Sequence, residues 1–260
     1  MNRKILLLLA ALVGLTFTGE AYANTSEEAY AYTPPESDIS PVVWYAGMVG
    51  GIERMTGRRS ESLTETIANV PTVTTYGIDH RMLENNGNLS FVGGFLIGPY
   101  SESIRIGPEF FFGRGNALSN VSDTRLDPAG AINRFYSTDF QRKFFYGGLV
   151  RIGYLFCEKY FLSLSIGIDR SQFRTKRIFA LDPNFVANVI DRTKGFNGFL
   201  FGVGFEKLFK NFIIGIDFKL IQYRRQSNDD SLVITNIPAS SNLSIRPVMY
   251  TTGIRLCYRF

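Results

Sequence analysis

The stretch Pro247-Val-Met-Tyr-Thr-Thr-Gly-Ile-Arg-Leu-Cys-Tyr-Arg-Phe260 alternates between apolar and polar side chains. Successive side chains of a β-strand point to opposite faces, so the stretch predicts a strand with two chemically different faces. One face is apolar and aromatic: Val248, Tyr250, Thr252, Ile254, Leu256, Tyr258 and Phe260. The other is cationic or small: Met249, Thr251, Gly253, Arg255, Cys257 and Arg259.

Seven earlier segments show a similar pattern, so we expect eight strands in all. The alternation is clearest from Tyr160, where Leu162 and Leu164 share one face and Ser163 and Ser165 the other. The first segment is rich in glycine, and its faces stay unassigned. The expected strands are 44–54, 89–98, 103–113, 139–156, 160–174, 195–209, 212–226 and 247–260.

The connections between these strands alternate in length. Short turns are expected at 99–102, 157–159 and 210–211, and long polar loops at 55–88, 114–138, 175–194 and 227–246. An antiparallel meander with tight turns at one rim and long loops at the other is the plan of a transmembrane barrel. The sequence therefore predicts an all-β fold, an eight-stranded antiparallel up-and-down transmembrane β-barrel, with both termini on the periplasmic side.

Alternation alone does not decide which face points outward. A soluble, lipocalin-like barrel would enclose its apolar face around a ligand. The polar face here carries both signs of charge together with glycine, which suits a crowded interior. Aromatic residues gather near the strand ends on the apolar face, as they do at membrane interfaces. These are Phe112, Tyr154, Phe156, Tyr160, Phe205, Phe212, Tyr250, Tyr258 and Phe260.

The plan of 44–260 and the closing Tyr258-Arg-Phe260 resemble the eight-stranded outer-membrane β-barrel superfamily of OmpA-, OmpX- and Opa-like domains. In that family a terminal Phe, with Tyr two positions earlier, is part of the signal read by the outer-membrane assembly machinery. The resemblance implies this role for Tyr258 and Phe260. It also implies a bacterial outer-membrane location, whereas functions within the group vary widely.

The N-terminus has the features of an export signal. Two cations, Arg3 and Lys4, precede an apolar run over 5–17 and a small-x-small pattern at Ala21-Tyr-Ala23. The run is short for a bilayer span, although a retained anchor is the alternative. We expect a cleaved signal peptide at 1–23, a flexible acidic periplasmic linker at 24–43 and the barrel at 44–260.

The lumen of the expected barrel would collect charges of both signs. An interior of eight strands is only wide enough to be filled by side chains, and a buried charge without a partner is costly. A structural network of ion pairs is therefore expected, with a proton or ion path as the alternative. Its members are Arg105, Glu109, Arg151, Asp169, Glu206, Asp217, Lys219, Arg255 and Arg259.

Few residues suit catalysis or metal binding. A hydroxyl nucleophile needs a base within hydrogen-bond reach. The one histidine that could serve as this base, His80, lies in the first long loop. We expect no enzyme activity, no metal site and no cofactor. An even number of cysteines in an exported protein favours a disulfide. Cys157 and Cys257, however, fall on opposite walls of the expected barrel, so two free thiols are predicted, with a disulfide between them as the alternative.

Function is expected in the outward loops. The third loop is framed by basic residues that form a candidate surface binding patch: Arg174, Lys176, Arg177, Arg192 and Lys194. Within that loop, 181–190 predicts a short helix because Asp182 would cap it and Pro183 would start it.

Removing Arg3, Lys4 and Glu20 lowers the formal net charge from +5 to +4, which does not indicate a nucleic-acid binder. The leading hypothesis is a monomeric, non-enzymatic surface antigen or adhesin that contacts host surface proteins, glycans or lipopolysaccharide. A structural outer-membrane barrel without a specific ligand and a lipid-modifying enzyme are the alternatives.

Overall fold

The computed structural model describes residues 42–67, 70–72, 80–98, 103–126, 133–157, 159–180, 188–234 and 237–260. All of them belong to one compact unit, Asp38–Phe260. The expected signal peptide lies outside the described residues, as does the expected linker except for Val42 and Val43, which begin the first strand.

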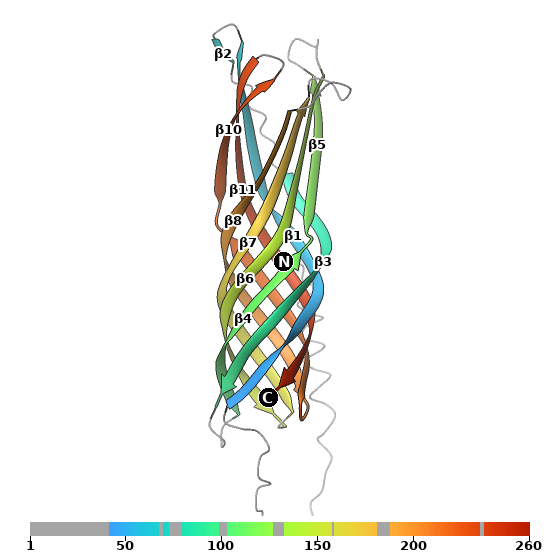
Figure 1. Cartoon of the computed structure of the whole chain (residues 1–260), viewed down its shortest axis with the longest axis vertical. Helices are drawn as coiled ribbons and strands as arrows, with labels where there is room; N and C mark the ends of the chain where they lie inside the picture. The colour runs from blue at the N-terminus through green and yellow to red at the C-terminus, as the bar shows by residue number, and fades with distance from the viewer. Residues whose placement is uncertain are drawn as a thin grey trace, which may run out of the picture. The chain divides into compact units, whose positions relative to one another are not determined.

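Every regular element among the described residues is a β-strand (Figure 1). No helix in this part of the chain is long and apolar enough to cross a membrane. The strands are β1 (Val42–Ile67), β2 (Val70–Thr72), β3 (His80–Ile97), β4 (Ile104–Gly115), β5 (Leu118–Leu126), β6 (Asn133–Phe156), β7 (Tyr160–Ala180), β8 (Asn188–Leu208), β9 (Phe212–Tyr223), β10 (Gln226–Ile234) and β11 (Ile237–Arg259).

These strands close into an antiparallel ring of eight. The order around the wall is β1, β3, β4, β6, β7, β8, β9, β11, and β11 pairs back onto β1 from Tyr45↔Arg259 to Glu65↔Ala239. β5 continues the line of β4 along β6, and β10 continues the line of β9 along β11. The predicted eight-stranded barrel is therefore confirmed.

The two faces of the wall differ in the predicted way. Outward-facing side chains in the lower part form an apolar belt, and Phe110 (69% exposed), Ile168 and Ile254 are among its most exposed members. Inward-facing positions on the same strands are mostly buried, and Arg255 is an example between the exposed Ile254 and Leu256. An exposed apolar ring around a buried polar interior suits a hydrocarbon surrounding, and it reverses the arrangement of a soluble barrel.

Above the apolar belt the strands continue far into the regions expected to be loops. β7 runs on to Ala180 and β6 begins at Asn133, so most of 114–138 and 175–194 is paired strand. The expectation of long polar loops is wrong over these stretches, because polar side chains that resemble a loop sequence belong here to paired strands. Once a strand leaves the belt, both of its faces can be polar while its ladder persists. The predicted helix at 181–190 lies mostly outside the described residues, and 188–190 belongs to β8.

This extension consists of two separate sheets. Pairing between β3 and β4 ends at Asn88↔Gly115, and pairing between β8 and β9 ends at Gly198↔Tyr223. Above those rows, β10, β11, β1 and β3 form a first extension sheet, and β5, β6, β7 and β8 form a second. Figure 1 shows β10 and β5 on opposite sides of the upper barrel.

We expect the folded protein to be heat-modifiable in detergent gels. A closed barrel has no free edge at the belt and its backbone groups are paired, so detergent alone should leave it folded. Unboiled and boiled samples should therefore migrate differently. Identical migration, or recovery in a soluble fraction, would contradict the membrane assignment.

Substitutions on the two faces should have different effects on assembly. Leu256→Arg places a charge in the apolar belt, which costs about 2–4 kcal/mol near the bilayer midplane. Thr251→Asn changes a lumen-facing position on the same strand and should be far milder. The measurement is the folded fraction by heat-modifiability after assembly into lipid vesicles. Normal assembly of Leu256→Arg together with failure of Thr251→Asn would reverse the assigned faces.

Candidate functional site in the lumen and the extension

A lower charge cluster in the lumen is centred on Arg255. Its guanidinium donates to Glu109 through Nη1 (2.6 Å to Oε2) and Nη2 (3.0 Å to Oε1). Nη2 also lies 2.6 Å from Asp217 Oδ2, and Nε lies 2.9 Å from Glu206 Oε1. One cation thus contacts carboxylates on three other strands, β4, β8 and β9.

Arg151 extends the lower cluster across the barrel. Its Nη2 donates to Glu206 Oε1 (2.5 Å) and to Ser163 Oγ (3.0 Å), and its Nη1 lies 3.4 Å from Glu109 Oε2. The Tyr45 hydroxyl donates to the same Glu109 oxygen at 2.9 Å. Since Glu109 and Glu206 are fully buried, these contacts supply the partners that their charges require.

An upper charge cluster lies closer to the extension. Arg142 Nη1 donates to Glu53 Oε2 (2.7 Å), and its Nη2 donates to Asp169 Oδ2 (3.0 Å). The other Asp169 oxygen accepts from Tyr223 (2.6 Å) and Ser171 (2.5 Å), and Glu53 also accepts from the Ala117 amide (2.9 Å). Two carboxylates therefore share one guanidinium and are further satisfied by neutral donors.

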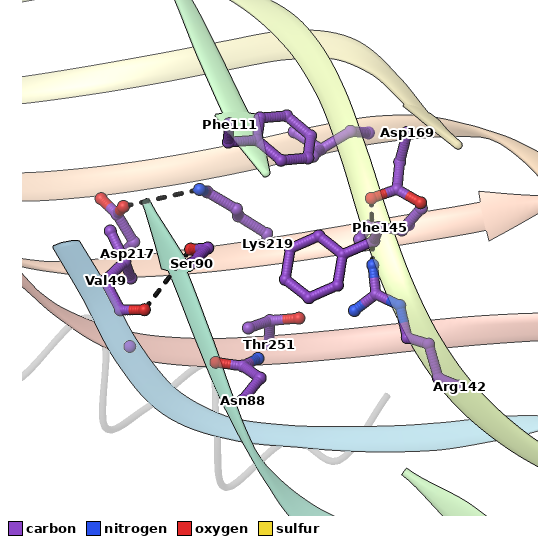
Figure 2. A pocket seen from close by; sticks show the side chains of 13 residues that line it. Val49, Asn88, Ser90, Phe111, Arg142, Phe145, Asp169, Asp217, Lys219 and Thr251 are labelled. Atoms are coloured by element: carbon purple, nitrogen blue, oxygen red, sulfur yellow. Dashed lines mark hydrogen bonds and ion pairs between the residues drawn. The ribbon is translucent and has the colours of Figure 1, made fainter. Parts of the chain in front are cut away.

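A small cavity separates the two clusters (Figure 2). Its volume of about 20 Å³ is enough for one water molecule. Lys219 lies on one side, with Nζ 3.7 Å from Asp217, and Arg142 points toward Asp169 on the other. Thr251 also lines the cavity, and its hydroxyl has no hydrogen-bond partner among the described residues.

An aromatic layer fills the lumen above the upper cluster. Phe173 stacks on Phe140 with ring centroids 4.7 Å apart. Phe196 and Tyr223 form T-shaped pairs with Phe173, with ring centroids 5.0 and 5.2 Å from its own. Tyr223 belongs to both levels, because its hydroxyl reaches Asp169. Side chains thus pack the interior in successive layers, which suits structural support better than free diffusion of solutes.

Most of the predicted lumen residues lie in these clusters: Glu109, Arg151, Asp169, Glu206, Asp217, Lys219 and Arg255. Arg105 is also buried, and it donates to the Gly98 carbonyl at 2.9 Å. Arg259 is half-buried near the end of β11, and no ion pair joins it to another described residue.

Sequence reasoning missed Glu53 and Arg142. Glu53 shares the inward parity of Tyr45 and Val49, but the glycines of β1 obscured that pattern. Arg142 has the opposite parity to Arg151 on the same strand, so simple alternation places it outside. A β-bulge between Arg142 and Phe145 adds one residue and turns Arg142 inward.

The two extension sheets are joined by an ion-pair clasp. Asp230 on β10 pairs with Arg177 on β7 and with Arg192 on β8, the latter at 2.7 Å. Arg177 Nη1 also donates to Ser241 on β11 at 2.9 Å. Arg177 and Asp230 are almost fully buried, so this contact lies between the sheets.

The candidate surface patch is divided between the two faces of the wall. Arg174 and Lys176 face outward on β7, whereas Arg177 is buried in the clasp. Arg192 and Lys194 occupy the inward parity of β8, and Arg192 belongs to the clasp. A loop would allow the five cations to converge, but in a strand neighbouring positions point to opposite faces.

Arg174 is paired on the outer surface. Its Nε donates to Asp191 Oδ1 at 2.8 Å, and its Nη2 also contacts Asp191. This hydrogen bonding holds the pKa of the Asp191 carboxyl below its ordinary value, and it raises the pKa of the Arg174 guanidinium. The outward surface here therefore mixes both signs of charge.

The remaining candidates are dispersed. His80 begins β3, with its backbone opposite Arg59. Cys157 is exposed, Cys257 is buried, and both thiols are free, as predicted. Among the described residues, no group of three or more His, Cys, Asp or Glu could hold a metal ion. Tyr258 and Phe260 are exposed on the outer face, with ring centroids 5.2 Å apart.

No protein-family model and no curated protein matches the chain. Among solved structures, it is similar to the outer-membrane protease OmpT of Escherichia coli (10% identity, TM-score 0.48, covering 85% of this chain and 98% of that one). It is also similar to the outer-membrane protein OprG of Pseudomonas aeruginosa (10% identity, TM-score 0.45, covering 84% of this chain and 96% of that one). A third similar structure is that of the attachment invasion locus protein Ail of Yersinia pestis, in complex with the heparin analogue sucrose octasulfate (12% identity, TM-score 0.32, covering 84% of this chain and 99% of that one). These likenesses are too distant to assign an activity.

We expect Arg255→Leu to be strongly destabilising. It would leave Glu109, Asp217 and part of Glu206 without their central cation, and breaking a buried pair in this way costs roughly 3–5 kcal/mol. Lys219→Met is the matched control. In this variant Asp217 keeps its contact with Arg255, so the free energy of unfolding should fall much less. Denaturant unfolding in lipid vesicles measures both. Equal losses would show that Arg255 is not the centre of the cluster.

Proposed function

We propose that this eight-stranded outer-membrane barrel is a non-enzymatic bacterial surface protein whose extension contacts host surface proteins, glycans or lipopolysaccharide. The supporting observation is the extension itself. Beyond Ile168, the last apolar outward residue of β7 within the belt, the strand continues to Ala180 and stays paired with β6 and, as far as Phe179, with β8. At about 3.3 Å per residue, these twelve residues extend roughly 40 Å along the strand.

The extension is built to hold its shape. Its strands are hydrogen-bonded in pairs, and the clasp of Asp230 with Arg177 and Arg192 joins the two sheets. A surface that is ordered before binding loses less conformational entropy when a partner arrives. Supporting the lipid belt requires no such projection, so the extension favours a contact role over a purely structural one.

The outward surface of the second extension sheet is suited to polar partners. Arg170, Gln172 and Arg174 follow one another on the exposed face of β7, and Lys176 continues the row half-buried. Single exposed ion pairs contribute little, but several can sum for a multivalent polyanion such as a sulfated glycan.

Two other functions differ in what they require. A structural barrel would need the packed lumen and the belt but not the extension. A lipid-modifying enzyme would need His80 as a base. His80→Ala in cells, followed by mass spectrometry of the outer-membrane lipids, tests the enzyme directly, and a lipid change lost in that variant would contradict the non-enzymatic proposal.

Trimming one hairpin of the extension tests the contact role. In the trimmed variant, residues 175–192 are replaced by an Asn-Gly turn that joins Arg174 to Thr193, which are paired across β7 and β8. The full-length and trimmed proteins are displayed on bacteria and tested for binding to host cells and to arrays of host proteins and glycans. We expect the trimmed barrel to remain heat-modifiable and to lose most binding.

A control variant that removes charges but keeps the strands distinguishes recognition of the extension's shape from recognition of its charge. Arg174→Gln with Lys176→Gln keeps both strands and the clasp while removing two outward cations. Binding that is lost only on trimming indicates recognition of the protruding shape, and binding lost in both variants indicates a polyanion. Full binding by the trimmed barrel, or none by the full-length protein, would favour the structural role.

A further inference from the structure

Arginines gather at one height on the outer wall formed by β9/β10, β11, β1 and β3. Arg58 on β1 lies directly opposite Arg246 on β11. Arg224 and Arg225 connect β9 to β10, and the pairs Val248↔Gln222 and Ile245↔Gln226 place them beside Arg246. We call Arg58, Arg224, Arg225 and Arg246, all exposed, the arginine band. On its other side, Arg81 of β3 occupies the register position opposite Arg58.

The arginine band lies at the upper rim of the apolar belt. Along the outward face of β11, Tyr250 is followed by the half-buried Val248 and then by Arg246. On β1 the exposed Ile52 is followed by Arg54, Thr56 and Arg58. Two residues of strand advance about 7 Å, so the band lies one such step beyond Val248 on β11 and three steps beyond Ile52 on β1.

This arrangement is unfavourable for an isolated barrel. Adjacent strands are about 4.8 Å apart, and like charges directly opposite each other on one face destabilise a sheet. No described residue forms an ion pair with Arg58, Arg224, Arg225 or Arg246, although Arg225 donates to Ser244 at 2.5 Å. Asp229, an outward-facing acid higher on β10, already accepts from Asn242.

The opposite wall shows a different arrangement. There the outward Arg174 is paired with Asp191, and Lys176 lies in register between Asp191 and Asp139. Cations interleaved with acids are expected on any solvated surface. Cations gathered without acids at a fixed height indicate that an external anion supplies the compensating charge.

We propose that the arginine band binds the phosphate groups of a phosphorylated glycolipid in the outer leaflet of the membrane. A guanidinium can bind two phosphate oxygens at once, and several at one height can hold a headgroup that carries more than one phosphate. The glycolipid is the fitting source of phosphate because the band faces sideways at the rim of the belt, directly above Tyr250 and Val248, where the sugar and acyl chains of a lipid can pack. This inference rests on the outer-membrane location in the proposed function, but not on any host partner.

The test compares a band variant with a matched control in refolded, detergent-solubilised full-length protein. The band variant is Arg58→Gln with Arg246→Gln, and the control is Lys159→Gln with Lys210→Gln, two exposed cations at the short-turn rim of the barrel. The probes are purified lipid A and the same lipid after enzymatic dephosphorylation, with binding measured by calorimetry. We expect lipid A to bind the band variant about tenfold more weakly than wild type, and to bind the control within about twofold of wild type.

Thermal unfolding provides a second readout that a folding defect cannot imitate. Without lipid, the band variant should be at least as stable as wild type, because like charges have been removed. Lipid A should raise the Tm of wild type and of the control but not that of the band variant, and dephosphorylated lipid should raise none of them.

Three results with lipid A would overturn the proposal: unchanged binding by the band variant, equally tight binding of the dephosphorylated lipid to wild type, or a loss of affinity in the control as large as in the band variant. A fourth contrary result would be wild-type protein that binds a soluble heparin tetrasaccharide as tightly as lipid A. The last result would identify a site for soluble polyanions instead. Failure of host binding by the displayed barrel would leave these lipid measurements unaffected, so the two proposals fail separately.

Discussion

The pairing of every backbone amide and carbonyl is the constraint from which the rest of this structure follows. Hydrocarbon offers these groups no alternative partner, so a sheet at membrane depth must close on itself. In this chain closure is achieved by β11 pairing with β1. Eight strands enclose a narrow interior, and every second residue of each strand must fit inside it. The packed lumen is therefore a consequence of closure.

The narrow interior also explains how charge is distributed. Glu109, Glu206 and Arg255 are almost entirely removed from solvent, and each contacts at least one opposite charge. Because Arg255 is shared among three acids, one long side chain contacts all of them, which leaves room for glycines beside them. Gly204 and Gly215 are examples: an added Cβ would come within 3 Å of Asp217 at the first and of Glu206 at the second. With its interior committed to packing, the barrel has its outer wall and its extension available for partners.

The strands in which apolar and polar side chains alternate could be predicted from the sequence. The eight wall strands were predicted, and their faces could be assigned where the alternation is clear, as in β7 and β11, because one face had to be apolar. Most members of the lower charge cluster are among the residues that this alternation places in the lumen. Arg142 could not be placed, since a bulge changes parity without any signature in composition. Most of the extension was also not predicted, because a strand in water needs no apolar face. For the same reason the sequence predicts Arg177 on the surface, whereas its side chain is buried between two sheets.

The arginine band was overlooked for a different reason. Arg58, Arg224 and Arg246 are far apart in sequence, and only the registers of β1, β9, β10 and β11 bring them to one height. Sequence reasoning identified basic residues that are close in the chain, such as Arg174 and Arg177, which the strand then separated. On a barrel wall, neighbours across strands are spatial neighbours, whereas neighbours along a strand are not.

The seam between β1 and β11 has a kinetic consequence. It joins Tyr45 to Arg259 and Glu65 to Ala239, so its contacts span nearly the whole barrel sequence. Contacts of such long range form slowly, because the chain between them must be brought together first. Until the last strand is synthesised, β1 has an open edge with no partner on one side, and such an edge invites pairing with other chains. A nascent chain of this kind depends on being kept apart from its neighbours until the ring can close.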